Sequence, residues 1–119
     1  WYAKAAGFDG FLRWAYNSWV ENPLLDSRYS TWPAGDTYLV YPEARSSIRF
    51  ERLREGIQDV EKIRIIQNEL AVSKKTEDSE KLKRLTSVLS AFSSTNARNA
   101  EECIYIVNAG KEVLNEVSR

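Results

Sequence analysis

The sequence predicts a mixed α/β fold dominated by helices, and two observations lead to this prediction. All four Trp, all three Pro and five of the six Tyr lie in the first 42 residues, which is typical of short strands and functional loops. After residue 46, apolar residues recur at steps of three and four, which is typical of amphipathic helices. We therefore expect one domain over residues 1–119, with strands and loops in residues 1–45 and three amphipathic helices in residues 46–119.

The composition excludes several classes of function. Lys and Arg together number 17, and so do Asp and Glu, so the chain lacks the basic excess of a nucleic-acid-binding protein. The absence of His removes the Ser-His-Asp arrangement and most zinc sites, and a single Cys allows no internal disulfide. We expect Cys103 to lie in the core, and we expect no metal, no cofactor and no membrane span.

The first part contains two strand candidates. Residues 1–6 resemble the end of an amphipathic helix that Gly7 stops, and Phe8–Ala15 and residues 36–42 are short apolar runs. Both runs are almost continuously apolar, which favours strands of a parallel sheet that is covered on both faces. The long loop over residues 17–35 is of the kind that carries function. Two strands alone make a poor sheet, so we expect the chain to be a piece of a larger fold.

Three helices are expected after the strands. The first covers residues 47–72, with Ser46 or Ser47 as its N-cap and with Gly56 at a close backbone contact. Its apolar stripe consists of Leu53, Ile57, Val60, Ile63, Ile66 and Leu70. The second covers residues 78–93, with an apolar stripe of Leu82, Leu85, Leu89 and Phe92.

The third helix covers residues 99–117, where Asn99 and Glu102 resemble a capping box. Its expected inward residues are Ala100, Cys103, Ile104, Val107, Leu114 and Val117. Three such helices with short connections can pack as an antiparallel bundle. The alternative is an all-α bundle with an irregular N-terminal arm.

Three blocks of sequence resemble a known family. They are "GFDGFLRWAYNSW" (residues 7–19), "PAGDTYLVYP" (residues 33–42) and "SSIRFERLREGIQDVEKI" (residues 46–63). In this order they are similar to the C-terminal end of the catalytic domain of glycoside hydrolase family 123, a region also described as a domain of unknown function in bacterial, Bacteroides-type glycan-degrading proteins. The resemblance covers about residues 1–72.

The resemblance implies a (β/α)8 barrel of which this chain holds the last strands and the final helix. It implies a retaining β-N-acetylgalactosaminidase in which the substrate's acetamido group is the nucleophile and an adjacent Asp-Glu pair assists, in a periplasmic or extracellular protein. No Asp-Glu pair occurs here in that order. Glu101 and Glu102 are adjacent, but they lie in the first turn of a helix, where acids favour the helix dipole. We expect no catalytic residue in this chain and no activity from it alone.

Sugar binding is the role that the resemblance implies for the first part. Trp and Tyr rings stack on the apolar face of a pyranose, and Asn, Arg or Asp side chains bind its hydroxyl groups. In a barrel these groups gather at the carboxyl ends of the strands. The expected substrate-binding residues are Trp14, Tyr16, Asn17, Trp19, Asp36 and Tyr41.

Structural roles remain open for several of these residues and their neighbours. Trp14 could pack in the core, Trp19 and Trp32 could anchor the loop, and Asn17 could cap a turn. Arg13 could form a structural ion pair, and Asp36 could serve the turn that Gly35 begins.

The charged residues after residue 58 favour structure over chemistry. We expect Asp59 and Glu61 to lie on an ion-paired helix face, and the charges of residues 74–84 to form a solvated face. A second class of function is also open, a non-catalytic interaction module whose aromatic arm docks onto a partner or self-associates through exposed strands. The expected partners are otherwise an N-acetylgalactosamine-type glycan and the rest of a parent chain.

Overall fold

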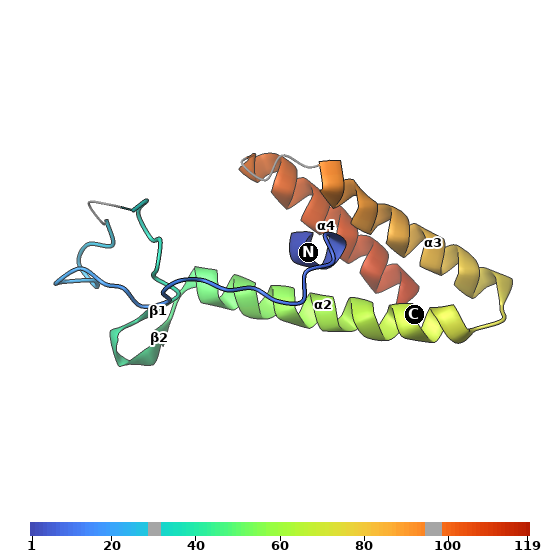
Figure 1. Cartoon of the computed structure of the whole chain (residues 1–119), viewed down its shortest axis with the longest axis horizontal. Coiled ribbons are helices and arrows are strands. Elements are labelled where there is room, and N and C mark those ends of the chain that lie inside the picture. Colours follow the sequence, from blue (N-terminus) through green and yellow to red (C-terminus); the bar gives the residue numbers. More distant parts are fainter. Residues whose placement is uncertain (29–31, 95–98) are drawn as a thin grey trace. The chain divides into compact units, whose positions relative to one another are not determined.

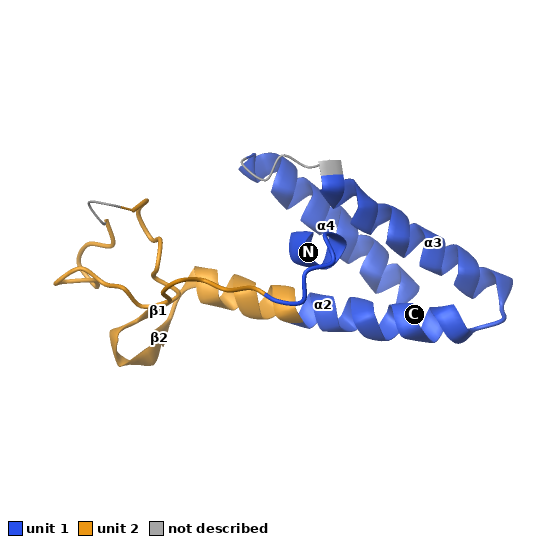
Figure 2. Cartoon of the chain, viewed as in Figure 1, with its two compact units in different colours: residues 1–10, 58–119 blue, residues 11–57 orange. Residues whose placement is uncertain are grey.

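A computed structural model describes residues 1–28, 32–94 and 99–119, and it is dominated by helices, as the sequence predicts (Figure 1). In chain order, the elements are α1 (Tyr2–Ala5), β1 (Val40–Tyr41), η1 (Pro42–Ala44), β2 (Arg45–Ser46), α2 (Ile48–Val72), α3 (Thr76–Ala91), η2 (Phe92–Ser94) and α4 (Ala100–Val117). The chain divides into two compact units, with residues 1–10 and 58–119 in unit 1 and residues 11–57 in unit 2 (Figure 2). The boundary between the units falls within α2.

One apolar core holds unit 1 together. It joins α2, α3 and α4 through Ile63, Ile66, Leu85, Leu89, Leu114 and Val117. Burying an aliphatic side chain of this size contributes about 1.5–3 kcal/mol to the free energy of unfolding, so these six side chains account for much of the stability of the unit. The expected packing of three amphipathic helices is therefore found, at bounds within about two residues of the expected ones, which is the usual uncertainty of a helix end.

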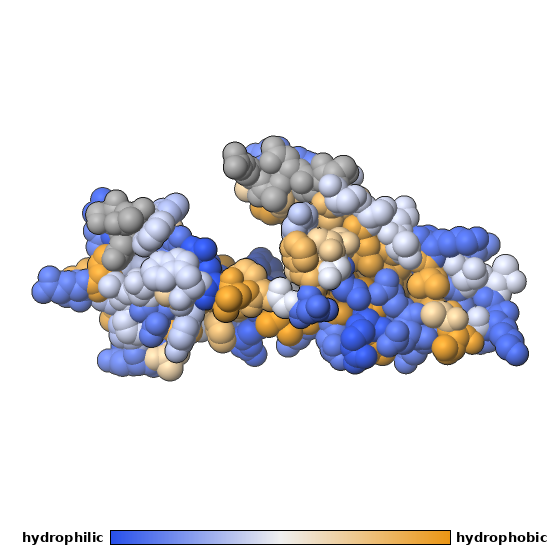
Figure 3. Space-filling model, in the orientation of Figure 1, coloured by the Kyte–Doolittle hydropathy of each residue, from blue (hydrophilic) through white to orange (hydrophobic). Residues whose placement is uncertain are grey.

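The apolar stripes extend beyond the core at several positions, where the sequence-based expectation is wrong. Ile57 and Ile104, expected to face inward, are 60% and 61% exposed, and Ala100 is also exposed. Ile57 belongs to unit 2, outside the bundle core, and the core residues of α4 all lie in its second half. In the view of Figure 3, hydrophobic and hydrophilic side chains are accordingly interspersed over the helices of unit 1.

The expected helix ends are confirmed by their hydrogen bonds. The backbone N–H of Phe50 donates to Oγ of Ser47 (3.2 Å), so Ser47 caps α2. The N–H of Glu102 donates to Oδ1 of Asn99 (3.2 Å), which caps α4. Gly7 follows α1 with a φ of +72°, a left-handed conformation that glycine adopts without steric cost.

Trp1 is the residue that fixes the N-terminal segment on the bundle. Its Nε1–H donates to Oδ2 of Asp59 (2.8 Å), and its ring stacks on Phe92 with centroids 5.7 Å apart. A Cβ atom built on Gly110 of α4 would lie only 2.7 Å from Cζ3 of Trp1.

The close backbone contact expected at Gly56 is wrong, because nothing lies within 4 Å of a Cβ atom built there.

The charged residues of unit 1 form the ion-paired surface that the sequence predicts. Nζ of Lys111 lies 3.7 Å from Oδ2 of Asp59, which also accepts the Trp1 indole hydrogen. Arg64 donates through Nε to Glu61 (3.0 Å), and this hydrogen bond lowers the pKa of the Glu61 carboxyl below its usual value. Both acids thus have basic partners on the helix surface, as expected.

The strands of unit 2 differ from the expected ones. Phe8–Ala15 forms no strand, and its large apolar side chains are exposed, Leu12 to 93%. Within residues 36–42 only Val40 and Tyr41 are strand residues, and they pair with β2 in an antiparallel hairpin rather than in a parallel sheet. A continuously apolar strand is typical of a sheet covered on both faces, and among the described residues no strand pairs with Phe8–Ala15. The (β/α)8 barrel therefore remains a prediction.

Tyr38 is the centre of unit 2. It is fully buried, and its hydroxyl oxygen accepts the backbone N–H of Val20 (3.0 Å). An isolated antiparallel bridge pairs Tyr38 with Asn17, and the N–H of Leu39 donates to the carbonyl of Tyr16 (3.0 Å). These contacts tie residues 16–20 to residues 38–40 and so fix the frame on which the polar side chains of the unit are arranged.

Candidate functional site

Two surface pockets lie in unit 2. The first, here called the arginine pocket, has a volume of about 250 Å³ and is lined by Phe11, Arg13, Ala34, Gly35, Asp36, Thr37, Leu39 and Arg49. The second, here called the hairpin pocket, has a volume of about 340 Å³ and is lined by Pro23, Leu24, Leu25, Asp26, Ser27, Tyr41, Arg45 and Ser46. One volume lies just below and the other just inside the lower end of the range of small-molecule sites, so each pocket suits only a small ligand.

Asp36 carries the negative charge of the arginine pocket. Its Oδ1 accepts hydrogen bonds from the guanidinium of Arg13 and from the backbone N–H of Thr37, the latter at 2.9 Å. Thr37 has a φ of +62°, which is unusual for a β-branched residue and costs about 1–3 kcal/mol. Its hydroxyl donates to the carbonyl of Ser18 (2.9 Å). The carboxylate is therefore held in one place by a strained and well-bonded turn.

Arg49, the second residue of α2, carries a positive charge into the same pocket. Its Nε–H donates to the carbonyl of Tyr38 (2.9 Å) and its Nη2 to the hydroxyl of Tyr41 (3.3 Å). A Cβ atom built on Gly35 would lie 2.9 Å from Nη1 of Arg49, and Gly35 has a φ of +82°. A glycine at this turn thus leaves the space in which the guanidinium lies.

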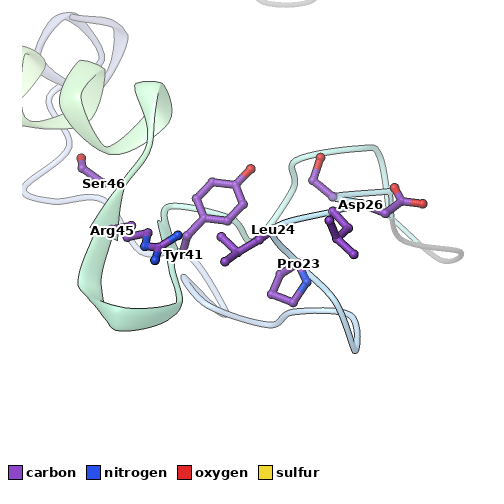
Figure 4. A pocket seen from close by; sticks show the side chains of 8 residues that line it. Pro23, Leu24, Asp26, Tyr41, Arg45 and Ser46 are labelled. Atoms are coloured by element: carbon purple, nitrogen blue, oxygen red, sulfur yellow. The ribbon is translucent and has the colours of Figure 1, made fainter.

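The hairpin pocket lies between the loop that precedes residue 28 and the β1–β2 hairpin. Figure 4 shows Tyr41 and Arg45 on the hairpin side, and Pro23, Leu24 and Asp26 on the loop side. Both charged residues already have partners, because Arg45 pairs with Glu43 (2.8 Å) and Asp26 with Arg28 (2.8 Å). The hydrogen bonds from Arg28 lower the pKa of Asp26 to about 2, so this carboxyl is ionised throughout the neutral range.

The aromatic residues expected to stack on sugar divide into two kinds. Trp14 and Trp32 lie with ring centroids 5.7 Å apart and are 59% and 41% exposed, so Trp14 is no core residue and its ring is accessible to a ligand. Trp19 is partly buried, and its Nε1–H donates to the carbonyl of Val40 (2.8 Å), which anchors the loop to β1.

The six expected substrate-binding residues are only partly brought together. Asp36 lines the arginine pocket, and Tyr41 lines the hairpin pocket while its hydroxyl contacts Arg49. The side chains of Tyr16 and Asn17 are exposed and line neither pocket, although their backbone groups pair with residues 38–40. The roles of all six in binding sugar stay predictions. Arg13 forms the ion pair that was one of its two possible roles.

Arg49 is the functional candidate that sequence reasoning missed. It lies within the third sequence block of the resemblance, where it reads as one of several cations on a helix surface. The available signal was its place at the start of the helix, two residues after the N-cap, because a cation is unfavourable at the positive end of the helix dipole.

Neither a metal-binding cluster nor a membrane-spanning helix occurs among the described residues. No group of three or more His, Cys, Asp or Glu side chains in residues 1–28, 32–94 and 99–119 could hold a metal ion. In the same part of the chain, every helix is too short or too polar to cross a membrane.

Comparison with known proteins identifies the family. The chain matches no curated protein and no solved structure at a significant level. The sequence profile of the family described as "Glycoside hydrolase 123, catalytic domain" matches residues 1–66, which is more than half of the chain and includes all of unit 2. The carboxylate, the guanidinium groups and the exposed Trp pair described above all lie within this matched region. The chain therefore belongs to the glycoside hydrolase 123 catalytic-domain family.

Proposed function

We propose that this chain supplies sugar-binding groups of a glycoside hydrolase that acts on N-acetylhexosamine glycans of the β-N-acetylgalactosaminide type, in a periplasmic or extracellular protein. The observation that carries this proposal is the Arg13–Asp36 ion pair in the wall of the arginine pocket. A carboxylate accepts hydrogen bonds from sugar hydroxyls and a guanidinium donates to them, so the pair offers both kinds of partner at one place. The exposed Trp14–Trp32 pair offers an apolar surface for the sugar ring.

The catalytic acids, in this proposal, are supplied from outside the chain. Glycoside hydrolysis requires two carboxyl-type groups around the scissile bond, or one together with the substrate's acetamido group and an orienting acid. Each of the two pockets is lined by one carboxylate, Asp36 in the arginine pocket and Asp26 in the hairpin pocket. Each of these carboxylates is already paired with an arginine, Asp36 with Arg13 and Asp26 with Arg28. Neither pocket thus offers an acid and an assisting partner.

Hydrolysis of a chromogenic β-N-acetylgalactosaminide tests this division. We expect no hydrolysis by the 119-residue chain. A longer chain, in which a family 123 segment with an Asp-Glu pair precedes Trp1, should hydrolyse the substrate. Turnover by the 119-residue chain itself would contradict the proposal that the acids lie elsewhere.

Binding tests the role of the pocket. Titration with N-acetylgalactosamine should shift the Trp fluorescence of the 119-residue chain. Asp36→Asn should weaken this binding about tenfold, because a hydrogen bond to a charged group contributes about 1.5–3 kcal/mol. Asp9→Asn, which removes the same charge from an exposed position that lines neither pocket, should leave the affinity unchanged. Equal weakening by both variants would count against the site.

A second candidate function is an interaction module, and one observation favours it. Phe8, Phe11, Leu12 and Trp14 expose large apolar side chains along a segment without regular structure. Such a segment can bind a partner or a second copy of the chain. Self-association in sedimentation, together with unchanged fluorescence on addition of N-acetylgalactosamine, would favour this candidate over sugar binding.

A further inference from the structure

The arginine pocket contains more positive than negative charge. Two guanidinium groups, those of Arg13 and Arg49, line it together with a single carboxylate, that of Asp36. Arg13 donates to Asp36, which neutralises one of the two cations. Arg49 forms no ion pair with any carboxylate in the described part of the chain. One full positive charge is therefore left over at the wall of a pocket.

The position of Arg49 adds to this imbalance. It lies in the first turn of α2, where the backbone N–H groups present the positive end of the helix dipole and favour an anion. The acid of that turn, Glu51, pairs with Arg54 (2.8 Å) and also accepts the hydroxyl of Ser46, so its charge is already matched. Two neutral oxygens, the carbonyl of Tyr38 and the hydroxyl of Tyr41, hold the guanidinium instead.

The geometry leaves donors on Arg49 for a ligand. Its Nε and Nη2 have protein acceptors, whereas its Nη1 lies beside Gly35, where a side chain would collide with it. A guanidinium has five N–H donors in a fixed planar arrangement, which matches the oxygens of carboxylate and sulfate groups. A fixed cation with free donors, in a pocket whose other cation is neutralised, is a suitable site for one anionic group.

We propose that the arginine pocket binds an anionic substituent of a sugar, a sulfate or a carboxylate, through Arg49. The substrate class would then be acidic glycans that carry N-acetylhexosamine. This inference rests on the proposed function, because it assigns the ligand's charge at the same pocket. The neutral part of the sugar would contact Asp36 and Arg13, and the anionic substituent would contact Arg49.

The first experiment compares ligands on the 119-residue chain. The probes are N-acetylgalactosamine, sulfated N-acetylgalactosamine, galacturonate and inorganic sulfate, followed by Trp fluorescence and by the Nε–H resonances of arginine in NMR spectra. We expect the sulfated sugar to bind about tenfold more tightly than the unsulfated sugar, because charge-assisted hydrogen bonds are about twice as strong as neutral ones. This preference should decrease as NaCl is added. The galacturonate titration shows whether a carboxylate serves as well as a sulfate.

Variants assign the preference to Arg49. Arg49→Gln should reduce the affinity ratio of sulfated to unsulfated sugar to about one, since of the two cations that line the pocket it removes the one without a carboxylate partner among the described residues. Arg49→Lys should retain part of the preference, because it keeps the charge but not the planar donors. Arg52→Gln makes the same charge change in the same helix, at an exposed residue that pairs with Glu55 (2.7 Å) and lines neither pocket, and should leave the ratio unchanged. Thermal unfolding followed by circular dichroism checks that each variant is folded.

Asp36→Asn distinguishes the two proposals, because it should change the affinities for an anion and for a neutral sugar in opposite directions. It removes the negative charge of the pocket, so it should strengthen the binding of inorganic sulfate while it weakens that of N-acetylgalactosamine. Binding of both sugars with equal affinity would overturn the inference and leave the proposed function intact. Preferential binding of the anionic probes that Arg49→Gln abolishes, without any binding of the neutral sugar, would support the anion site and contradict the neutral-sugar part of the proposed function. Binding of none of the four probes would overturn both.

Discussion

Gly110→Ala gives a sharp test of how Trp1 packs on the helices of unit 1. Gly110 lies in α4, in the interior of a helix, where alanine is usually more stable than glycine by about 1 kcal/mol. The added Cβ would lie 2.7 Å from Cζ3 and 2.9 Å from Cη2 of Trp1, both well inside contact distance. The Trp1 ring cannot move away freely, because it donates to Asp59 and stacks on Phe92.

The net effect of Gly110→Ala on the free energy of unfolding is the loss of Trp1 contacts less the gain in helix propensity. Displacing the ring loses a hydrogen bond to a charged acceptor, which contributes about 1.5–3 kcal/mol, and an aromatic contact that contributes about 0.5–1.5 kcal/mol. Partial retention of both contacts would reduce the loss to about 2–3 kcal/mol. After the gain in helix propensity, Gly110→Ala should lower the free energy of unfolding by about 1–2 kcal/mol.

Urea unfolding followed by far-UV circular dichroism measures this change, and a double-mutant cycle identifies its cause. In a Trp1→Ala background the collision is absent, so Gly110→Ala should instead raise the free energy of unfolding by up to about 1 kcal/mol. Gly56→Ala is the matched control, because Gly56 also lies inside a helix and nothing lies within 4 Å of its Cβ position. The reasoning is refuted if Gly110→Ala is stabilising to the same extent with and without Trp1.

Three further predictions concern other parts of the chain. The pKa of Asp26, followed by NMR, should be about 2. Any stability from its pair with Arg28 is therefore complete above pH 3.8 and is lost as the pH falls toward 2. In Arg28→Ala the pKa of Asp26 should return toward 3.8. Asn99→Ala should lower the free energy of unfolding by about 1 kcal/mol through loss of the α4 cap, measured by urea unfolding, and no change would show that the cap is dispensable. Backbone amides of residues 50–70 and 100–115 should exchange hydrogen more slowly than those of 8–28 and 32–41, and the opposite order would contradict the assignment of the stable core to the helices.

The helices of unit 1 could be predicted from the sequence because their signals are local. Ser47 and Asn99 mark the starts of α2 and α4 through hydrogen bonds to residues three positions later. The spacing of Leu85 and Leu89, or of Leu114 and Val117, predicts which face of a helix is buried. The periodicity of apolar residues does not indicate over which part of a helix the neighbouring helices pack. Ile104 is therefore exposed although it belongs to the apolar stripe of α4.

The strands could not be predicted because strand formation depends on distant partners. The segment Phe8–Ala15 has the composition of a buried strand, but a strand needs hydrogen-bonding neighbours that no local pattern supplies. The β1–β2 hairpin was missed for a different reason. Its connection requires left-handed backbone at Glu43 and Ala44, two residues whose identity does not signal such a conformation.

Candidate site residues could be proposed from the sequence where the neighbouring residues signal a turn or a strand end. They were missed where their place depends on contacts between residues that are distant in the sequence. Asp36 follows a glycine turn after a proline, and it lines the arginine pocket, while its role in binding stays a prediction. Arg49 lies 14 positions after Gly35, and only the folded chain brings its guanidinium against that glycine. The charge of the pocket, and with it the proposed class of ligand, was for this reason inaccessible from the sequence.

Tyr38 connects the stability of unit 2 to the geometry of the arginine pocket. Thr37 precedes it with a φ of +62°, a conformation that persists only where the surrounding contacts compensate for its cost. Those contacts are the Thr37 hydroxyl bond to Ser18 and the Tyr38 hydroxyl bond from Val20, both of which join residues 16–20 to the turn. The same turn places Asp36 opposite Arg13, and the Tyr38 carbonyl holds Arg49. The two charges that we propose face a ligand are thus fixed by the buried frame of the unit, so the proposed binding would require little further ordering of either side chain.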